Sequence, residues 1–184
     1  MSTLAGIVYV EGFLADDLPM FRWARDHVDW DERIRARKTA SYGVPYNYAG
    51  LDYLERPFPP ELDEVRTLAS ARIGIEANNC LLNYYPDGSS RMGFHADDTS
   101  GLVGGVAIVS LGAQRTLRFR RTAQLDDRVN YVLAPGSLLY LPREVHFEWQ
   151  HALPRSSQRD PRISLTFRQV APARQSVEAP GGAG

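Results

Sequence analysis

The sequence lacks several features that by themselves assign a protein to a class: multiple cysteines, a long apolar run and a targeting segment. Its 184 residues include one cysteine, Cys80, which excludes a disulfide framework and a zinc site of four cysteines. No run approaches the roughly 18 apolar residues that a membrane helix needs. Residues 1–13 also lack the basic start of a targeting segment. We therefore expect a cytoplasmic protein that does not engage a membrane.

An excess of charge of one sign is also missing. The 21 Lys+Arg and 22 Asp+Glu residues give a net charge of −1, which argues against the uniformly basic surface of a general nucleic-acid-binding protein. This neutrality is an average, because residues 1–113 carry 10 basic and 16 acidic side chains, whereas residues 114–170 carry 10 and 5. Lys38 is the single lysine. The excess of arginine over lysine is explained by genome composition, and the alternative is that some arginines bind carboxylates or phosphates in a bidentate manner.

The chain has the length and composition of one globular domain, with 43% hydrophobic and 23% charged residues. We expect that domain over residues 1–170, with N-terminal helices and a substrate-side segment in residues 1–50 and a β core in residues 78–170. Residues 171–184 lack an apolar pattern and are predicted to be a disordered tail.

The apolar spacing changes along the chain from a helical to a strand period. Steps of three and four residues predict one or two helices over residues 14–37 and another over residues 61–71, with Pro60 at its start. From residue 78 the period is two. Helices followed by strands predict an α+β fold, mainly β, with an antiparallel sandwich or barrel. The predicted strands cover residues 80–85, a short stretch up to 94, and residues 106–111, 115–121, 131–133, 137–141 and 163–167.

Three residues have the types and spacing of a metal site. His95 and Asp97 lie two apart, so in a strand both side chains point to one face, and His151 follows 54 residues after Asp97. Two histidines and one carboxylate suit a non-haem Fe(II) oxygenase. By itself, His-x-Asp is weak evidence, because such a pair occurs by chance at protein surfaces, and a third ligand is needed. We expect His146 to pack behind the site or at the surface rather than to bind metal.

Two arginines in the segment PRISLTFRQ have a spacing that predicts an anion site. Arg162 and Arg168 lie six residues apart, which puts both on the same face of one strand. Two buried cations on one face are costly unless anions neutralise them. The alternative is an edge strand with two solvated arginines.

Taken together, the motifs resemble the AlkB family of Fe(II)- and 2-oxoglutarate-dependent dioxygenases, which remove alkyl groups from nucleobases. The resemblance extends from Arg37 to Val170 and implies a double-stranded β-helix (jelly-roll) core with the N-terminal helices packed on one sheet. It rests on RKTASYGVPYNYAG (37–50), NYYPDGSSRMGFHADD (83–98), SLGAQRTLRFRR (110–121), GSLLYLP (136–142), WQHALP (149–154) and PRISLTFR (161–168).

The resemblance implies the cofactors Fe(II), 2-oxoglutarate and O2. His95, Asp97 and His151 would bind the iron and form the catalytic centre. Arg162 would pair with the distal carboxylate of 2-oxoglutarate, and Arg168 would lie toward its metal-chelating end. The other implied cosubstrate contacts are Asn83, also toward the chelating end, the hydroxyl of Tyr85, and Ser164.

The implied substrate is an alkylated base, such as 1-methyladenine or 3-methylcytosine, in single-stranded DNA or RNA or flipped out of a duplex. Oxidative demethylation would release formaldehyde, succinate and CO2. We expect the chain to act as a monomer. The residues expected on the substrate side are Asp98, Tyr42, Tyr46 and Tyr48, together with Arg118 and Arg120, which share the solvent-facing parity of their strand and would contact phosphates.

Two departures from the family pattern leave alternatives open. Ser164 stands where relatives have asparagine, and Thr99 follows His-x-Asp-Asp where relatives often have glutamate. One alternative is the same chemistry on a small metabolite or a protein side chain. Another is a non-catalytic nucleic-acid-binding module with a relic metal site.

Overall fold

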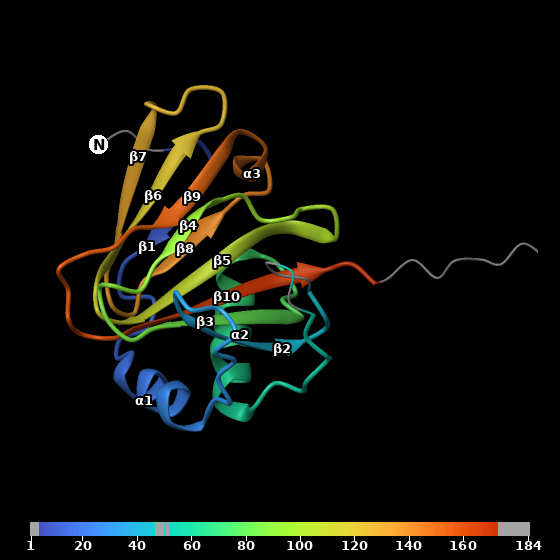
Figure 1. Ribbon diagram of the computed structural model, residues 1–184. Coiled ribbons are helices and arrows are strands. Elements are labelled where there is room, and N and C mark those ends of the chain that lie inside the picture. The colour runs from blue at the N-terminus through green and yellow to red at the C-terminus, as the bar shows by residue number, and fades with distance from the viewer. Residues whose placement is uncertain (1–3, 47–49, 51, 173–184) are drawn as a thin grey trace, which may run out of the picture.

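Two antiparallel sheets make up most of the protein, with helices covering one of them (Figure 1). The computed structural model describes residues 4–46, 50 and 52–172. The larger sheet has the order β1-β8-β5-β10-β3-β2, and the smaller has the order β4-β9-β6-β7. We call them the major sheet and the minor sheet. Their arrangement confirms the double-stranded β-helix predicted from the sequence.

The two sheets draw their strands from distant parts of the chain. In the major sheet these are β1 (Val8–Val10), β2 (Lys38–Gly43), β3 (Asn79–Tyr85), β5 (Leu102–Gly112), β8 (Leu138–Leu141) and β10 (Arg162–Val170). The minor sheet consists of β4 (Met92–His95), β6 (Arg115–Arg121), β7 (Arg128–Leu133) and β9 (Trp149–Leu153).

Alternation along β10 separates an apolar face from a polar one. Ile163, Leu165 and Phe167 are fully buried in the apolar cluster on the helix side of the major sheet. The intervening side chains face the space between the two sheets. Those residues, Arg162, Ser164, Thr166 and Arg168, are all buried and line a single pocket. The period of two therefore places four polar groups of one strand in the interior.

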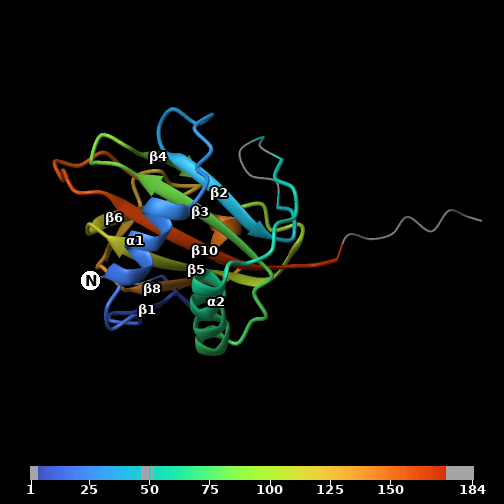
Figure 2. The ribbon, with the colours of Figure 1, turned by 90° about the horizontal axis from the view of Figure 1, so that it is seen from below.

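Helices α1 (Leu18–His27) and α2 (Pro60–Ile73) cover the outer face of the major sheet (Figure 2). Helix α2 confirms the predicted helix over residues 61–71, and it ends where Gly74 adopts a φ of 70°. Among the described residues no helix is both long and apolar enough to cross a bilayer.

The prediction of one or two helices over residues 14–37 is wrong in extent, because only one helix of ten residues forms there. Helix α1 has ten residues, and Val28 after it is extended, with φ −75° and ψ 130°. Leu14 and Val28 still pack against the helix-side cluster, so their apolar character continues the periodic pattern outside the helix. Strand β1 and the short helix α3 (Val145–Glu148) were not predicted.

Arg115 holds two loops together beside the pocket. Its side chain is buried, and its guanidinium donates to the carbonyl oxygens of Asp87 (3.2 Å), Ser90 (2.9 Å) and Pro154 (2.7 Å). The first two lie between β3 and β4, and the third follows β9. Since β4 and β9 carry the two histidines of the candidate site, this contact fixes the strands that position them.

Arg115→Met should lower the free energy of unfolding by about 2–4 kcal/mol, because a buried polar group left without a partner costs roughly 1–3 kcal/mol. Equilibrium urea denaturation measures this change. Arg118→Met, on the opposite face of β6, is the matched control and should change it by less than about 0.5 kcal/mol. Equal effects of the two substitutions would contradict this role of Arg115.

Candidate metal centre

Strand pairing in the minor sheet brings the two predicted histidines together. His95 at the end of β4 and His151 in β9 are direct cross-strand partners, and their ring centroids lie 4.4 Å apart. The side chain of His151 is 5% exposed and that of His95 is 27% exposed. One nitrogen of His95, Nδ1, lies 2.9 Å from the carbonyl oxygen of Gly93, which leaves Nε2 to face the site.

Asp97 completes the cluster just beyond the end of β4. Its Oδ1 lies 3.5 Å from Nε2 of His95 and 3.8 Å from Nε2 of His151. One ligand atom from each of the three residues lies within 4.8 Å of the others. The structure therefore brings together the three residues that the sequence predicted. Two imidazole nitrogens and one carboxylate oxygen on one side leave further coordination positions open, as a non-haem iron centre requires.

Arg168 fixes the second oxygen of Asp97. Its Nη2 donates to Oδ2 at 2.7 Å, and both side chains are almost completely buried. Burial alone would raise the pKa of Asp97, but the adjacent Arg168 guanidinium holds it well below the usual value. Asp97 is therefore ionised, and its Oδ1 faces the two histidines.

His151 is neutral and so can offer a lone pair to a metal. Burial lowers the pKa of His151 to about 3, because it disfavours the imidazolium more than Asp97 favours it. His146, whose pKa burial also lowers, accepts a hydrogen bond at Nδ1 from the backbone N–H of Asp97 (3.3 Å). It is absent from the three-residue cluster, so it packs behind the site.

A narrow pocket opens from the metal centre into the space between the sheets. Arg162 lies in its wall and is 2% exposed. Its Nη2 donates to Oγ of Ser110 at 2.9 Å, and its guanidinium lies 5.4 Å from the ring centroid of Tyr85. The pocket is lined by Leu81, Asn83, Tyr85, Met92, His95, Asp97, Ile108, Leu117, His151, Leu153, Arg162, Ser164, Thr166 and Arg168.

Arg162 has no protein carboxylate to neutralise it in the described part of the chain. Its Nε is buried with no hydrogen-bond partner among those residues, and burial lowers its pKa to about 10. A buried cation of this kind fits the free carboxylate of a bound small molecule. The donor set of the metal centre fits Fe(II), and the pocket beside it fits a dicarboxylate such as 2-oxoglutarate.

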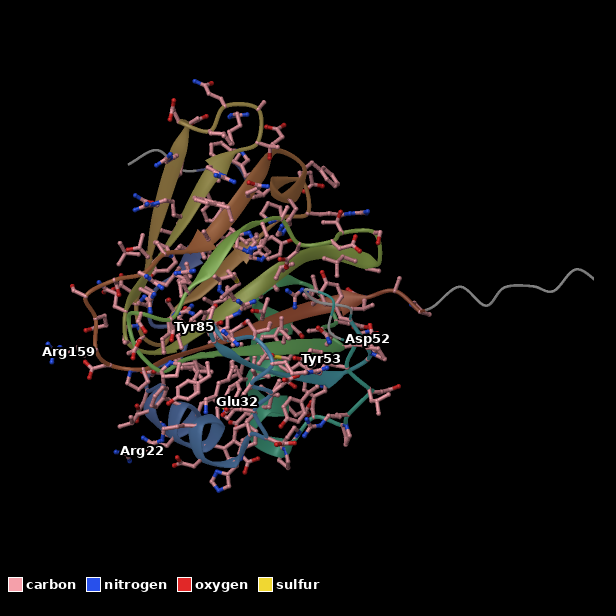
Figure 3. The ribbon with its side chains drawn as sticks, viewed as in Figure 1. Arg22, Glu32, Asp52, Tyr53, Tyr85 and Arg159 are labelled. Atoms are coloured by element: carbon pink, nitrogen blue, oxygen red, sulfur yellow. The ribbon has the colours of Figure 1, made fainter. Side chains whose placement is uncertain are left out.

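The other residues assigned to the cosubstrate also lie in this pocket. Tyr85 lies between the two sheets, whereas Arg22 and Arg159 project from the outer edge of the molecule (Figure 3). The Tyr85 hydroxyl contacts Sδ of Met92 at 3.8 Å. Asn83 and Ser164 are direct partners in the pairing of β3 with β10.

The residues assigned to the substrate side lie in several places. Tyr46 packs on Arg168, with 4.5 Å from the guanidinium to the ring centroid, and its hydroxyl donates to the backbone oxygen of Asp98. The Asp98 side chain is exposed, and the N–H of Ser100 lowers its pKa. Tyr42 instead belongs to the helix-side cluster, because the alternation of β2 turns it away from the pocket. Tyr48 lies outside the described residues.

Arg118 and Arg120 lie on the outer face of the minor sheet. Leu117 and Phe119, of the opposite parity, are buried between the sheets. Arg118 donates to Oδ1 of Asn130, and Arg120 donates to Oε1 of Gln150. The hydrogen-bond acceptors of both arginines are thus neutral amides, and both side chains lie on the face opposite the pocket.

Sequence reasoning assigned no role to several residues around the site. Thr166 shares the parity of Arg162 and Arg168, a signal that could have identified it as a pocket residue. Met92 and Arg37 had no such signal, because their contacts join segments that are distant in sequence. Arg37 is buried and donates from Nε to Oδ1 of Asn83 at 2.7 Å.

Sequence comparisons agree with this geometry. Residues 21–168 match the 2OG-Fe(II) oxygenase superfamily, whose description names both 2-oxoglutarate and Fe(II). The protein named DNA oxidative demethylase ALKBH2 is 36% identical in Mus musculus and 37% identical in Homo sapiens, over 76% and 73% of this chain. The human alpha-ketoglutarate-dependent dioxygenase alkB homolog 3 is 31% identical over 79% of the chain. The aligned parts cover 64%, 56% and 58% of these relatives, so the chain spans somewhat more than half of their length.

A solved structure supports the fold independently of close sequence similarity. The structure titled "The structure of OsALKBH1" has a TM-score of 0.69 to this chain at 16% identity. The superposed region covers 92% of this chain and 100% of the other chain. At this identity the likeness concerns the fold alone. From the superfamily match and its relatives, the chain belongs to the 2OG-Fe(II) oxygenase superfamily and, within it, to the AlkB family.

Proposed function

We propose that this protein is an Fe(II)- and 2-oxoglutarate-dependent dioxygenase that oxidatively demethylates N-alkylated nucleobases in DNA or RNA. One observation carries the proposal. The metal-ligand cluster of His95, Asp97 and His151 opens into a pocket that contains a buried arginine, Arg162, with no carboxylate partner in the described residues. A metal that needs open positions and a cosubstrate with a free carboxylate account for both features.

The chain's own residues would divide the work as follows. His95, Asp97 and His151 hold the iron, and Arg168 keeps the Asp97 carboxylate ionised and oriented. Arg162 binds the distal carboxylate of 2-oxoglutarate, and Asn83, Tyr85 and Ser164 lie beside the cosubstrate. When bound, the iron and its cosubstrate supply the oxidation of the N-methyl carbon by O2, with release of formaldehyde, succinate and CO2.

The substrate class rests on the relatives and on the residues next to the metal ligand Asp97. The ALKBH2 relatives are named DNA oxidative demethylases. Asp98 provides an exposed, ionised carboxylate one residue beyond the metal ligand Asp97. A methylated adenine or cytosine ring carries positive charge, so this carboxylate suits it electrostatically. Tyr46 contacts both the backbone oxygen of Asp98 and the Arg168 guanidinium, so its ring could pack against such a base.

We further propose that the outer face of the minor sheet contacts the nucleic-acid backbone. Arg118 and Arg120 have no carboxylate partner among the described residues, so their charges are available to phosphates. Arg120 also stacks on Phe94 of β4, at 4.0 Å from the ring centroid. Strand β4 lies at the edge of the minor sheet. Single-stranded nucleic acid with its base bound near Asp98 would therefore pass over this edge to reach Arg118 and Arg120.

The protein with Fe(II), ascorbate and 2-oxoglutarate should convert 1-methyladenine or 3-methylcytosine in a single-stranded oligonucleotide to the unmodified base. Mass spectrometry of the oligonucleotide and assay of succinate measure the reaction. Asp97→Ala should abolish it and weaken metal binding by more than the roughly 10–100-fold that loss of an outer-sphere partner costs.

Asp26→Asn, an exposed change on α1, is the control for this experiment and should leave turnover unchanged. Succinate formation that depends on iron but leaves every methylated base intact would redirect the substrate to a small molecule or a protein. Metal binding without any turnover of 2-oxoglutarate would overturn the proposed function.

Arg162→Met should raise the dissociation constant of 2-oxoglutarate on the order of 100-fold, because a buried charge-assisted hydrogen bond pair contributes roughly 3 kcal/mol. Calorimetric titration of the Mn(II)-loaded protein measures this change. Arg159→Met, at the outer edge of the molecule (Figure 3), should leave the constant unchanged. An unaltered affinity in Arg162→Met would remove Arg162 from the cosubstrate site.

Arg118→Gln and Arg120→Gln should each weaken binding of a single-stranded oligonucleotide independently of its sequence. Each should also reduce the slope of log affinity against log salt by about 0.7, the value for one lost phosphate contact on a single strand. Fluorescence anisotropy over a salt series measures the slope. Arg72→Gln removes the same charge from the exposed side of α2 and should not change it. An equal response of all three variants would indicate only a general charge effect.

A further inference from the structure

A row of four small polar residues crosses the major sheet on the face that looks into the space between the sheets. Strand register makes Thr39 of β2 the partner of Asn83 of β3, Asn83 the partner of Ser164 of β10, and Ser164 the partner of Ser110 of β5. All four are buried. Asn83 and Ser164 line the pocket beside the metal centre.

Two buried arginines contact this row, each at one position. Arg162 donates to the Ser110 hydroxyl, and Arg37, which precedes β2, donates from Nε to Oδ1 of Asn83 at 2.7 Å. The two cations have different relations to the pocket. Arg162 lies in the pocket wall, whereas Arg37 is not among the pocket-lining residues. Arg37 therefore reaches the pocket through Asn83.

The chemistry of the two side chains determines which way the Asn83 amide faces. A guanidinium has donors only, so the atom that receives its hydrogen bond is the carbonyl oxygen of the amide and not the nitrogen. This fixes an orientation that is otherwise ambiguous for asparagine. With the oxygen held by Arg37, the NH2 group is the part of the amide left for the pocket. A carboxylate accepts hydrogen bonds and cannot donate them, so this orientation suits an anionic ligand.

We propose that Arg37 is a positioning residue for 2-oxoglutarate. Arg37 holds the side-chain amide of Asn83 so that the NH2 group of Asn83 faces the cosubstrate. This inference rests on the proposed function. Without Arg37, the amide can rotate and present its oxygen to the ligand carboxylate, and like partial charges then oppose binding.

A double-mutant cycle in the Mn(II)-loaded full chain tests the proposal, with the dissociation constant of 2-oxoglutarate measured by calorimetry. Arg37→Met should raise this constant about tenfold, which corresponds to the loss of one oriented hydrogen bond. Asn83→Ala should raise it by a similar factor. In the Asn83→Ala background, Arg37→Met should have no further effect, because the group through which it acts is gone.

Arg35→Met is the matched control, since Arg35 lies two residues from Arg37 and is exposed. It should leave the affinity for 2-oxoglutarate unchanged. The Mn(II) affinity should be the same in all variants, and the Michaelis constant for 2-oxoglutarate should rise in Arg37→Met while kcat changes little. If Arg37→Met does not fold, Arg37→Gln replaces it, and a smaller loss of affinity is expected because the glutamine amide can still donate.

The outcomes separate this inference from the proposed function. Absence of 2-oxoglutarate binding by the unaltered protein would overturn both. Normal binding by the unaltered protein and by Arg37→Met would overturn only the role of Arg37. A further loss when Arg37→Met is added to Asn83→Ala would show that Arg37 acts on the ligand directly or through the fold, and would also overturn it. A parallel fall in Mn(II) affinity would assign Arg37 a purely structural role.

Discussion

The buried ion pair between Arg168 and Asp97 joins the two sheets at the metal centre. Arg168 belongs to β10 of the major sheet, and Asp97 follows β4 of the minor sheet. A carboxylate in this environment would take up a proton if it were alone, since burial disfavours its charge. Arg168 keeps it ionised and binds Oδ2, so that Oδ1 is the oxygen that faces the two histidines. The position of the sheets and the geometry of the site thus depend on the same contact.

The second buried arginine of β10, Arg162, makes the distribution of charge along the pocket asymmetric. Arg168 is neutralised by a protein carboxylate, whereas Arg162, six residues away on the same strand face, has none among the described residues. The pocket is therefore electrically balanced at the metal end and carries an uncompensated cation in its wall. A ligand that chelates a metal through one end and carries a carboxylate at the other matches this distribution. Asn83 and Ser164 of the polar row line the same pocket.

The apolar period of the sequence correctly predicted which side chains of a strand are buried, because this depends only on the alternation of side chains along the strand. The spacing of two in β10 correctly placed Arg162 and Arg168 on one buried face, and in β6 it correctly separated Phe119 from Arg118. The helical apolar period predicted the ends of helix α1 wrongly, because non-helical residues next to a helix can also be apolar when they pack against the core. Leu14 and Val28 extended the helical pattern beyond α1 although neither is helical, because both contact the same cluster as the helix does.

The sequence by itself determined which three residues form the metal-ligand cluster, the mainly β fold, and the two arginines that share one buried face of β10. These depend on residue type and on short spacings along a strand. Only the tertiary structure decided that His95 and His151 are direct partners, that Tyr42 faces away from the pocket, and that Arg37 holds Asn83. Such facts depend on strand register and on contacts between segments dozens of residues apart, and a register shift of one residue would turn every side chain to the other face.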